Sequence, residues 1–595
     1  MKLEHPRTWS TIESGFDSAD GTRLFYRAWQ PAAPPVDRPP RALIFLHRGH
    51  EHSGRIGGLV ERFGLHQDWA FAYDARGHGY SPGRRGDAPD VATLVADLDA
   101  FVRHVEARHA ISRADMIVVA NSVGAVVAAT WVHDYAPRIR GLVMAAAAFH
   151  IKLYVPLARP ALRCALRFRR TLFVSSYIRP GMLTHCADEA RAYAADPLIA
   201  KSISARLLLE LADTAQRIVA DAAAIDLPVL MLAADKDYVV SEAPQRHFFT
   251  RLASPLKRYL RLENCYHAVF YERDATTAVQ ASVDFIEACF GAPLPEPASY
   301  AAADRDGAAA RAYAALGRGG GIPARLYFGI QRRMLRVFGP LSEGMRIGLA
   351  HGFDSGESLD YVYRDQAAGR LGIGKLIDRA YLDAVGWRGV RVRRTQLQRM
   401  LAQRIAVHPP QETLRILDIA AGSARYLLET VKRFQDHRIE LTLRDYLGHN
   451  VDNARRLAAD LQLRVPIAFA VCDAFSEASY QGQENLYDIA VVSGLYELFS
   501  DNGQVSASLR AVVRCLKPGG YLIYTAQPWH PQLETIARTL TNHRGRPWTM
   551  RPRPQAEMDA LVDLAGAHKL ETVIGVDGIF TVSLARKGGA PAVDG

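Results

Sequence analysis

One serine in the N-terminal half stands in a setting typical of a nucleophile. Ser122 is the third residue of Ala-Asn-Ser-Val-Gly, directly after the apolar run 116–121, and Ala120 takes a position where glycine is usual. A strand that turns sharply into a helix at such a serine exposes the hydroxyl for attack on an ester. A serine that merely caps a helix would give a similar pattern. The pattern therefore needs partners before it indicates catalysis.

Two such partners follow Ser122 in the order acid, then histidine, that this kind of hydrolase requires. Asp237 lies in the acidic loop after the apolar run 229–233, and His267 lies in the loop after the predicted strand 258–262. Asp235 is the alternative acid. We predict that His267 accepts the proton of Ser122, and that Asp237 orients the imidazole and stabilises its charged form.

A tetrahedral oxyanion at Ser122 also needs backbone N–H donors. We expect Val123, directly after the nucleophile, to supply one. Gly49, in the loop 46–55, is the predicted source of the other. Histidines 47, 50 and 52 in this loop could suggest a metal site, but they lack a recognised zinc-ligand spacing, and we predict no metal.

The C-terminal half carries a second group of chemically suggestive residues. The segment 415–426 has the pattern of a strand, a turn of small residues and a helix, and such a turn brings backbone close to a nucleotide-like ligand. Because the glycine spacing is not G-x-G-x-x-G, a dinucleotide is not favoured. The next predicted strands, 439–443 and 467–472, are followed by Asp445 and Asp473.

These landmarks resemble those of class I S-adenosylmethionine-dependent methyltransferases over roughly residues 370–588. The family's D-x-A-x-G-x-G motif is similar to 418–424, with Ala424 replacing the last glycine, and 516–520 is similar to the turn before its fifth strand. The resemblance implies that Asp445 binds the cofactor's ribose and that Asp473 contacts its adenine. The residues expected to contact S-adenosylmethionine are Asp418, Ala420, Gly422, Arg425, Asp445, Asp473 and Ser493; candidate bases are Tyr496, Glu497 and His530.

Residues 15–290 resemble the monoacylglycerol lipase and lysophospholipase branch of α/β hydrolases. The resemblance rests on 47–55, 74–81, the Ser122 elbow, Asp237 and His267, although Arg48 stands where the family has glycine. It implies carboxylic-ester substrates of the monoacylglycerol or lysophospholipid type, with Asp74 and His78 holding a turn. The whole chain is similar to a bacterial family in which such a hydrolase is fused to a class I methyltransferase.

Alternating apolar strands and helical patterns predict α/β architecture in both halves. We expect an α/β-hydrolase fold over 1–290 with a helical cap over about 148–213, then a linker rich in proline, alanine and glycine over 291–321. A Rossmann-like methyltransferase follows over 322–588, with a helical N-terminal extension and a core over about 410–588. Its sheet should end in a hairpin around Asp577-Gly578.

The composition narrows the remaining possibilities. The chain has 595 residues, a formal charge of +11 and six cysteines without a CxxC pair. Scattered cysteines, no apolar run of 18 residues and no apolar leader predict a cytoplasmic protein. No nucleic-acid recognition pattern accompanies the positive charge, so nucleic acid is not expected.

Two stretches with interleaved arginines and apolar residues, 151–173 and 322–338, are typical of a segment on an anionic membrane. They predict peripheral association with the inner face of the membrane; a lid helix with a solvated basic face is the alternative for the first.

The sequence thus favours a bifunctional enzyme that hydrolyses lipid-like esters and transfers a methyl group to an unknown acceptor. An alternative is a hydrolase whose C-terminal domain binds S-adenosylmethionine as a regulatory or scaffolding module. A third is a membrane-associated adaptor with two decayed folds. The fusion suggests linked steps only by association.

Overall fold

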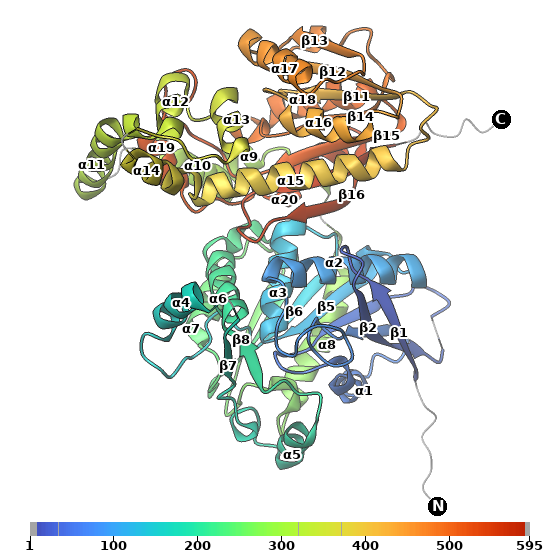
Figure 1. The fold of residues 1–595 in the computed structure, drawn as a ribbon. Coiled ribbons are helices and arrows are strands. Elements are labelled where there is room, and N and C mark those ends of the chain that lie inside the picture. Colours follow the sequence, from blue (N-terminus) through green and yellow to red (C-terminus); the bar gives the residue numbers. More distant parts are fainter. Residues whose placement is uncertain are drawn as a thin grey trace, which may run out of the picture. The chain divides into compact units, whose positions relative to one another are not determined.

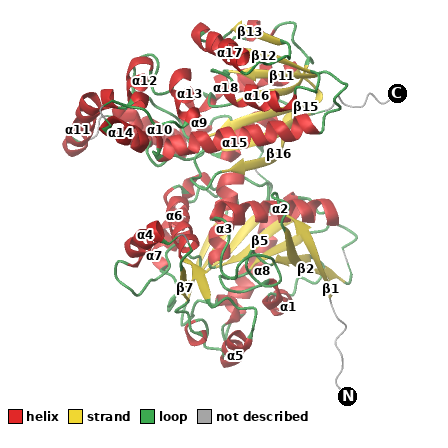
Figure 2. Ribbon diagram, viewed as in Figure 1, coloured by secondary structure: helices red, strands yellow, loops and turns green. Residues whose placement is uncertain are grey.

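The computed structural model describes residues 9–33, 35–169, 171–294, 296–318, 321–370 and 372–588. The chain forms two compact units, residues 1–295 and 296–595. Each unit contains its own sheet with helices packed against it (Figure 2). Both predicted α/β folds are therefore confirmed.

The sheet of the first unit has eight strands in the order β1-β2-β4-β3-β5-β6-β9-β10. Figure 1 labels β1, β2, β5 and β6 of this sheet. The six strands from β4 to β10 in this order are parallel, while β1 and β2 form an antiparallel edge. The strands are β1 (Trp9–Asp17), β2 (Arg23–Pro31), β3 (Ala42–Leu46), β4 (Trp69–Tyr73), β5 (Met116–Asn121), β6 (Gly141–Ala145), β9 (Val229–Ala234) and β10 (Lys257–Leu262).

Between β6 and β9 the chain forms a cap whose secondary structure is mixed. The sequence predicted helices there, but two short strands, β7 (Phe173–Ser175) and β8 (Ser202–Ser204), pair outside the main sheet. The helices of this unit are α1 (Gly57–Phe63), α2 (Val91–His109), α3 (Val123–Tyr135), α4 (Ala158–Phe168), α5 (Ala187–Ala195), α6 (Ala205–Ala220), α7 (Glu242–Arg251) and α8 (Thr276–Gly291).

The second unit has a seven-stranded sheet in the order β13-β12-β11-β14-β15-β17-β16. The first five strands in this order are parallel, and β17 lies antiparallel between β15 and β16. The strands are β11 (Leu414–Ile419), β12 (Ile439–Asp445), β13 (Ile467–Val471), β14 (Tyr487–Val492), β15 (Leu516–Ala526), β16 (Ala567–Ile574) and β17 (Thr581–Lys587). The predicted hairpin around Asp577-Gly578 joins β16 and β17.

Alternate residues of this sheet enter two separate hydrophobic cores, one containing Ile416 and the other Leu417. The helices that cover the sheet and extend beyond it are α9 (Ala303–Asp306), α10 (Ala308–Gly317), α11 (Ile322–Phe338), α12 (Glu343–His351), α13 (Gly356–Arg364), α14 (Ile373–Leu382), α15 (Val385–Ala406), α16 (Arg425–Val431), α17 (Gly448–Asp460), α18 (Asn502–Cys515), α19 (Leu533–Thr539) and α20 (Gln555–Leu564).

The segment predicted as a linker is largely helical where the structure describes it. Helices α9 and α10 occupy most of 303–317, where alanine favours helix. Asp304 Oδ2 accepts a hydrogen bond from Asn502 N at 2.8 Å, and Ala303 O accepts one from Arg551 at 3.2 Å. This segment is thus bound to the second unit.

A third hydrophobic core lies outside the sheet, among α13, α14, α15, α19 and the segment between β15 and β16. Trp387 and Trp548 stack within it, with ring centroids 5.9 Å apart. Among the helices of the described ranges, none combines the length and the apolar character that a membrane crossing needs.

Candidate active sites

The nucleophile elbow joins β5 to α3. Ser122 adopts φ +53° and ψ −113°, a strained conformation that a serine rarely takes. Its N–H donates to Ala145 O at 2.9 Å. A Cβ on Gly124 would lie 2.8 Å from His47 O, so only glycine lets α3 approach the loop after β3 this closely. Small residues thus hold the serine at the carboxyl edge of the sheet.

The three residues predicted as a triad lie in one hydrogen-bonded chain. His267 Nε2 is 2.9 Å from Ser122 Oγ, and His267 Nδ1 is 2.8 Å from Asp237 Oδ2. All three side chains are buried. Asp237 Oδ1 accepts hydrogen bonds from the N–H groups of Val239 and Val240, at 2.7 and 2.9 Å.

The electrostatic setting keeps Asp237 ionised. Burial alone would raise the pKa of its carboxyl, but the charge of His267 and hydrogen bonds from His267, Val240 and Val239 hold this pKa below its usual value. The alternative acid, Asp235, instead accepts a hydrogen bond from Cys265 N at 3.0 Å. Asp237 therefore has the geometry that an orienting acid requires.

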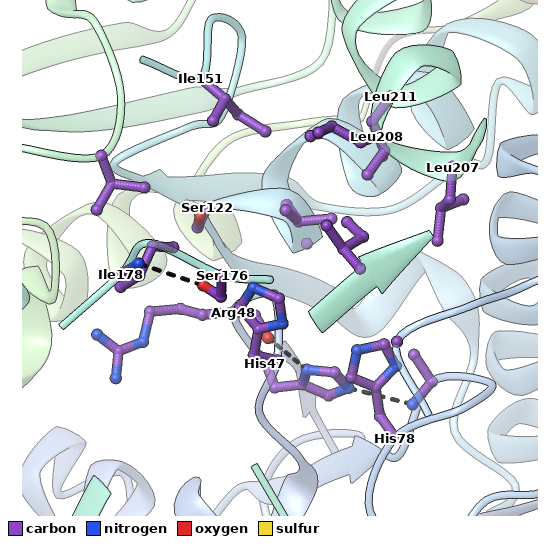
Figure 3. Close-up of a pocket in the computed structure, with 18 of the residues that line it drawn as sticks. His47, Arg48, His78, Ser122, Ile151, Ser176, Ile178, Leu207, Leu208 and Leu211 are labelled. Atoms are coloured by element: carbon purple, nitrogen blue, oxygen red, sulfur yellow. Dashed lines mark hydrogen bonds between the residues drawn. The ribbon is translucent and has the colours of Figure 1, made fainter. Parts of the chain in front are cut away.

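The predicted oxyanion donors Gly49 and Val123 line the same pocket as Ser122. A Cβ on Gly49 would lie 3.1 Å from Val123 Cγ2, so the two backbone segments adjoin. His47 fixes the loop, because Nε2 accepts from Ala75 N at 3.1 Å and Nδ1 lies 2.7 Å from Arg48 O (Figure 3). Burial lowers the pKa of His47, so the imidazole is neutral.

In the segments 47–55 and 74–81, Arg48, His52 and Asp74 form hydrogen bonds or ion pairs that hold the loops in place. Arg48 pairs with Glu51 through two hydrogen bonds of 2.9 and 2.5 Å, and His52 Nε2 lies 2.9 Å from Asp196 Oδ2. Asp74 accepts from the N–H groups of Ser53 and Tyr80, which ties the turn after β4 to the loop after β3.

The pocket around Ser122 is a cavity of about 140 Å³ with mostly apolar walls. Leucines of α6 and residues of the cap face it across from the serine (Figure 3). Its apolar lining includes Ile151, Leu153, Val174, Ile178, Leu183, Ile203, Leu207, Leu208 and Leu211. Walls of this kind favour an apolar ligand. In the sequence, Ile151 and Leu153 form part of a predicted membrane-surface segment, and no motif marks the other cap residues as lining of a pocket.

In the second unit, a cavity of about 340 Å³ lies at the carboxyl ends of β11, β12 and β14. Five of the seven predicted cofactor residues line it: Ala420, Gly422, Asp445, Asp473 and Ser493. Gly422 has φ +57°, and a Cβ there would meet open space, so its left-handed turn leaves room for a ligand. Asp445 Oδ2 accepts from Gly422 N at 2.9 Å, which couples the glycine turn to the end of β12.

The other two predicted residues do not line this cavity. Asp418 is fully buried: its Oδ1 accepts from Tyr426 Oη at 2.5 Å, and its Oδ2 has no hydrogen-bond partner among the described residues. Burial raises the pKa of Asp418 to about 8. Arg425 forms an ion pair with Asp360: Nε donates to Oδ1 at 2.5 Å and Nη2 donates to Oδ2 at 3.1 Å, which indicates a structural role.

The polar side chains of this cavity fit an adenosine-type cofactor. Two carboxylates, Asp445 and Asp473, can accept hydrogen bonds from hydroxyl and amine groups. Ser493 Oγ and Asn450 Oδ1 are buried and lack partners within the described ranges. Unpartnered buried polar atoms call for an explanation, and a polar ligand supplies one.

The three candidate bases lie in different surroundings. Tyr496 is enclosed in a sheet core with Oη 3.1 Å from Ser508 Oγ. Glu497 and His530 instead line a further cavity. Arg393 and Trp548 line the same cavity, and neither was predicted as a site residue. Arg393 is one of several arginines on α15, and no local pattern distinguishes it.

The fold and the site of each unit together indicate the class of protein to which that unit belongs. The first unit is an α/β hydrolase with a serine elbow, and the second has the sheet of a methyltransferase-like domain. Residues 37–274 match the family described as “serine aminopeptidase, S33”, and residues 282–587, more than half of the chain, match the family described as “putative methyltransferase”. The chain belongs to this second family and carries a hydrolase domain before it.

Similar proteins extend over one or both units. The chain is 43% identical over 578 residues to the “uncharacterized protein YnbC” of Escherichia coli, which covers 96% of this chain and 98% of that protein. It is 26% identical over 262 residues to a monoacylglycerol lipase of Mycolicibacterium smegmatis, which covers 44% of this chain and 91% of the lipase. A crystal structure of a Paleococcus ferrophilus monoacylglycerol lipase superposes with a TM-score of 0.40 at 22% identity, over 45% of this chain and 99% of that one.

Proposed function

We propose that this chain is a bifunctional enzyme: a serine hydrolase of monoacylglycerol-like or lysophospholipid-like esters, and an S-adenosylmethionine-dependent methyltransferase. The observation that carries the hydrolase half is the continuous chain from Ser122 Oγ through His267 to Asp237. A serine that only capped a helix would need neither the histidine nor the acid.

In the hydrolytic step, His267 removes the proton of Ser122 as Oγ attacks the ester carbonyl, and Asp237 stabilises the imidazolium that forms. The N–H groups of Gly49 and Val123 bind the oxyanion of the tetrahedral intermediate. His267 then protonates the leaving alcohol, and water releases the acyl group by the same route. Arg48 does not disturb this arrangement, because Glu51 engages its guanidinium.

The apolar cap supports a substrate with one hydrocarbon chain. The test compares hydrolysis of monoacylglycerols and lysophospholipids of increasing chain length, with a short soluble ester as reference. Wild-type enzyme should prefer long chains, and Ser122→Ala should hydrolyse none of them. Equal rates on short and long chains would argue against a lipid substrate.

For the second activity, the group to be held is S-adenosylmethionine, whose sulfonium supplies an electrophilic methyl group. Asp445 would bind the ribose hydroxyls, Asp473 the adenine amine, and the turn at Ala420 and Gly422 would approach the nucleoside. These contacts would position the cofactor, and positioning supplies much of the rate in such a displacement.

Calorimetric titration of S-adenosylmethionine tests this half directly. Asp445→Ala should abolish binding, while Asp452→Ala, on the exposed face of α17, should leave it unchanged. A methylated product in cell extract would support methyl transfer. Binding without any product would instead favour a regulatory or scaffolding module.

We also propose peripheral binding to an anionic bilayer at the inner face of the membrane. Helix α11 has no acidic residue, and its apolar side chains at i, i+4 spacing, Ile322, Leu326, Ile330 and Met334, are all exposed. The same helix carries Arg325, Arg332, Arg333 and Arg336, whose positive charges complement the negative charges of anionic headgroups. Sedimentation with phosphatidylglycerol vesicles, but not with phosphatidylcholine vesicles, is expected, and Leu326→Asp with Ile330→Asp should abolish it.

A further inference from the structure

A second cavity in the methyltransferase unit, distinct from the cofactor cavity, has a volume of about 220 Å³. Its walls come from the third hydrophobic core: α15 contributes Trp387 and Val390, and the segment between β15 and β16 contributes Trp548 and Met550. Phe353, Tyr381 and Phe580 form the rest of the aromatic wall. The parallel strands of the sheet contribute little to this cavity. It is formed mainly by the helices that precede β11 and by the segment between β15 and β16.

This cavity adjoins the predicted cofactor cavity. Asp354, Leu359, Gly494 and Leu498 line both. Gly494 directly follows Ser493 at the end of β14 and has φ +73°. A Cβ there would lie 3.0 Å from the guanidinium nitrogens of Arg393. The glycine therefore allows Arg393 to reach the boundary between the two cavities.

Three of the side chains that line this mostly apolar cavity each have a buried polar atom without a hydrogen-bond partner in the described structure. Arg393 donates from Nη1 to Glu497 Oε1 at 3.2 Å, and both side chains are more than nine-tenths buried. Arg393 Nε, Glu497 Oε2 and Trp548 Nε1 have no hydrogen-bond partner in the described part of the chain. Each such atom costs about 1–3 kcal/mol when it stays unpaired, so three around one cavity point to a ligand with polar character.

His530 adds a donor to the same wall. Its Nδ1 accepts a hydrogen bond from Gln532 N at 3.0 Å, and burial lowers the pKa of the imidazole to about 4. The neutral ring must then carry its proton on Nε2, which makes Nε2–H a donor and argues against His530 as the base. Glu497, with a carboxylate oxygen left over from the Arg393 pair, is the better proton acceptor.

We propose that this cavity binds the methyl acceptor, and that the acceptor is a largely apolar, ring-containing molecule with a hydroxyl group. Aromatic walls fit a ring. A carboxylate is disfavoured, because Glu497 already neutralises Arg393 and both Asp354 and Glu497 line the cavity. A hydroxyl can donate to Glu497 and accept from His530.

This inference rests on the proposed methyltransferase activity. Glu497 would take the hydroxyl proton as the oxygen bonds to the sulfonium methyl group. The carbon–sulfur bond breaks, its electron pair stays on sulfur, and the products are a methyl ether and S-adenosylhomocysteine.

The first test uses full-length protein and three probes: 1-naphthol, naphthalene and 1-naphthoate. Calorimetry without cofactor should show that 1-naphthol binds more tightly than naphthalene and that 1-naphthoate does not bind. Glu497→Gln keeps the side chain's shape and should weaken 1-naphthol binding by about tenfold, the loss of one charge-assisted hydrogen bond. Its matched control, Glu534→Gln on the exposed part of α19, should bind like wild type.

Folding of the variants is checked by their affinity for S-adenosylmethionine, which should stay unchanged. Trp548→Phe, which keeps a ring and removes the unpartnered N–H, serves as a second variant and should also weaken 1-naphthol binding. With cofactor present, wild type should form 1-methoxynaphthalene. Equal binding of naphthalene and 1-naphthol, no effect of Glu497→Gln, preferred binding of 1-naphthoate, or no binding of any probe would overturn the inference. Failure of S-adenosylmethionine to bind would overturn the proposed activity, while the probe measurements would still report on the cavity.

Discussion

The two proposed sites differ in how complete they are without ligand. In the hydrolase unit, Ser122, His267 and Asp237 already satisfy one another, and Asp237 uses its second oxygen on backbone N–H groups. In the methyltransferase unit, Asp418, Ser493, Arg393 and Glu497 each keep a buried polar atom unpaired in the described structure. The triad is organised by hydrogen bonds within the fold, whereas these four residues of the second unit keep hydrogen-bonding capacity that polar ligands would fill.

If the triad is preorganised in this way, removing its nucleophile has the largest effect of any change we consider. Ser122→Ala should lower kcat/KM for a long-chain monoacylglycerol by roughly 10⁴-fold or more, because the covalent route is lost. Binding of S-adenosylmethionine should not change. Exposed Ser112→Ala is the matched control for the hydrolytic assay. Labelling by a fluorophosphonate should disappear in Ser122→Ala alone, and persistent labelling there would place the nucleophile elsewhere.

The next largest effect is expected at the acid. Asp237→Asn keeps the size of the side chain but no longer stabilises the imidazolium, so kcat should fall on the order of 10³–10⁴-fold. Asp235→Asn, which alters hydrogen bonds from the backbone N–H groups of Cys265 and Asn264 outside the triad, should have a far smaller effect. If Asp235→Asn were the more damaging of the two, the assignment of the acid would be wrong.

The comparison also predicts that S-adenosylmethionine stabilises one unit selectively. At 100 times its Kd, the cofactor should add about 2.7 kcal/mol to the free energy of unfolding of residues 296–595. Calorimetry should then show one thermal transition moving to higher temperature and the other staying in place. In Asp445→Ala neither should move. A shift of both transitions in wild type would mean that the units unfold together.

Much of both sites could be predicted from sequence because their landmarks are local and ordered along the chain. The Ser122 elbow, Asp237 and His267 each follow a strand, and parallel strands end at one edge of a sheet. Arg393 and Trp548 could not be predicted in this way, since they lie more than 150 residues apart, on a helix and an irregular insertion. The edge strand β1 could not be predicted from the sequence, because much of it is exposed and it carries no apolar run.

Two segments contain regular structure that the sequence did not reveal, for identifiable reasons. Proline and glycine around 291–321 suggested a linker, but the alanines between them favour helix, and Asp304 and Ala303 anchor the segment by hydrogen bonds. The cap was expected to be helical, yet β7 and β8 pair there; three-residue strands are too short for a periodic pattern to reveal.

Asp418 offers a smaller, pH-dependent test of the incomplete site. With its pKa raised by burial to about 8, the folded unit holds a proton on Asp418 at neutral pH, whereas the unfolded chain releases it above about pH 4. The folded state binds more protons, so this group makes stability fall as pH rises from about 4 to 8. Asp418→Asn should flatten the decline in Tm of the methyltransferase transition across this range. An unchanged slope would show that Asp418 is ionised in the folded protein.

The smallest expected effect concerns Ala424, which stands where the methyltransferase family has glycine. Its φ is +52°, and a left-handed alanine costs about 1–2 kcal/mol. Its methyl group, however, is buried in a sheet core and contributes about 0.8 kcal/mol, and glycine would add about 0.4–1 kcal/mol of entropy loss on folding. Ala424→Gly should therefore change the free energy of unfolding by less than about 0.8 kcal/mol in either direction.

Ala110 in the hydrolase unit is the informative counterpart. It has a similar φ of +53° at the end of α2, but it is exposed, so no buried methyl offsets the strain. Ala110→Gly should stabilise its unit by about 0.5–1 kcal/mol, measurable as a higher first-unit Tm. A larger gain from Ala424→Gly than from Ala110→Gly would mean that the methyl of Ala424 is not usefully packed. The alanine would then be a strained feature of the cofactor turn, as Ser122 is of the nucleophile elbow.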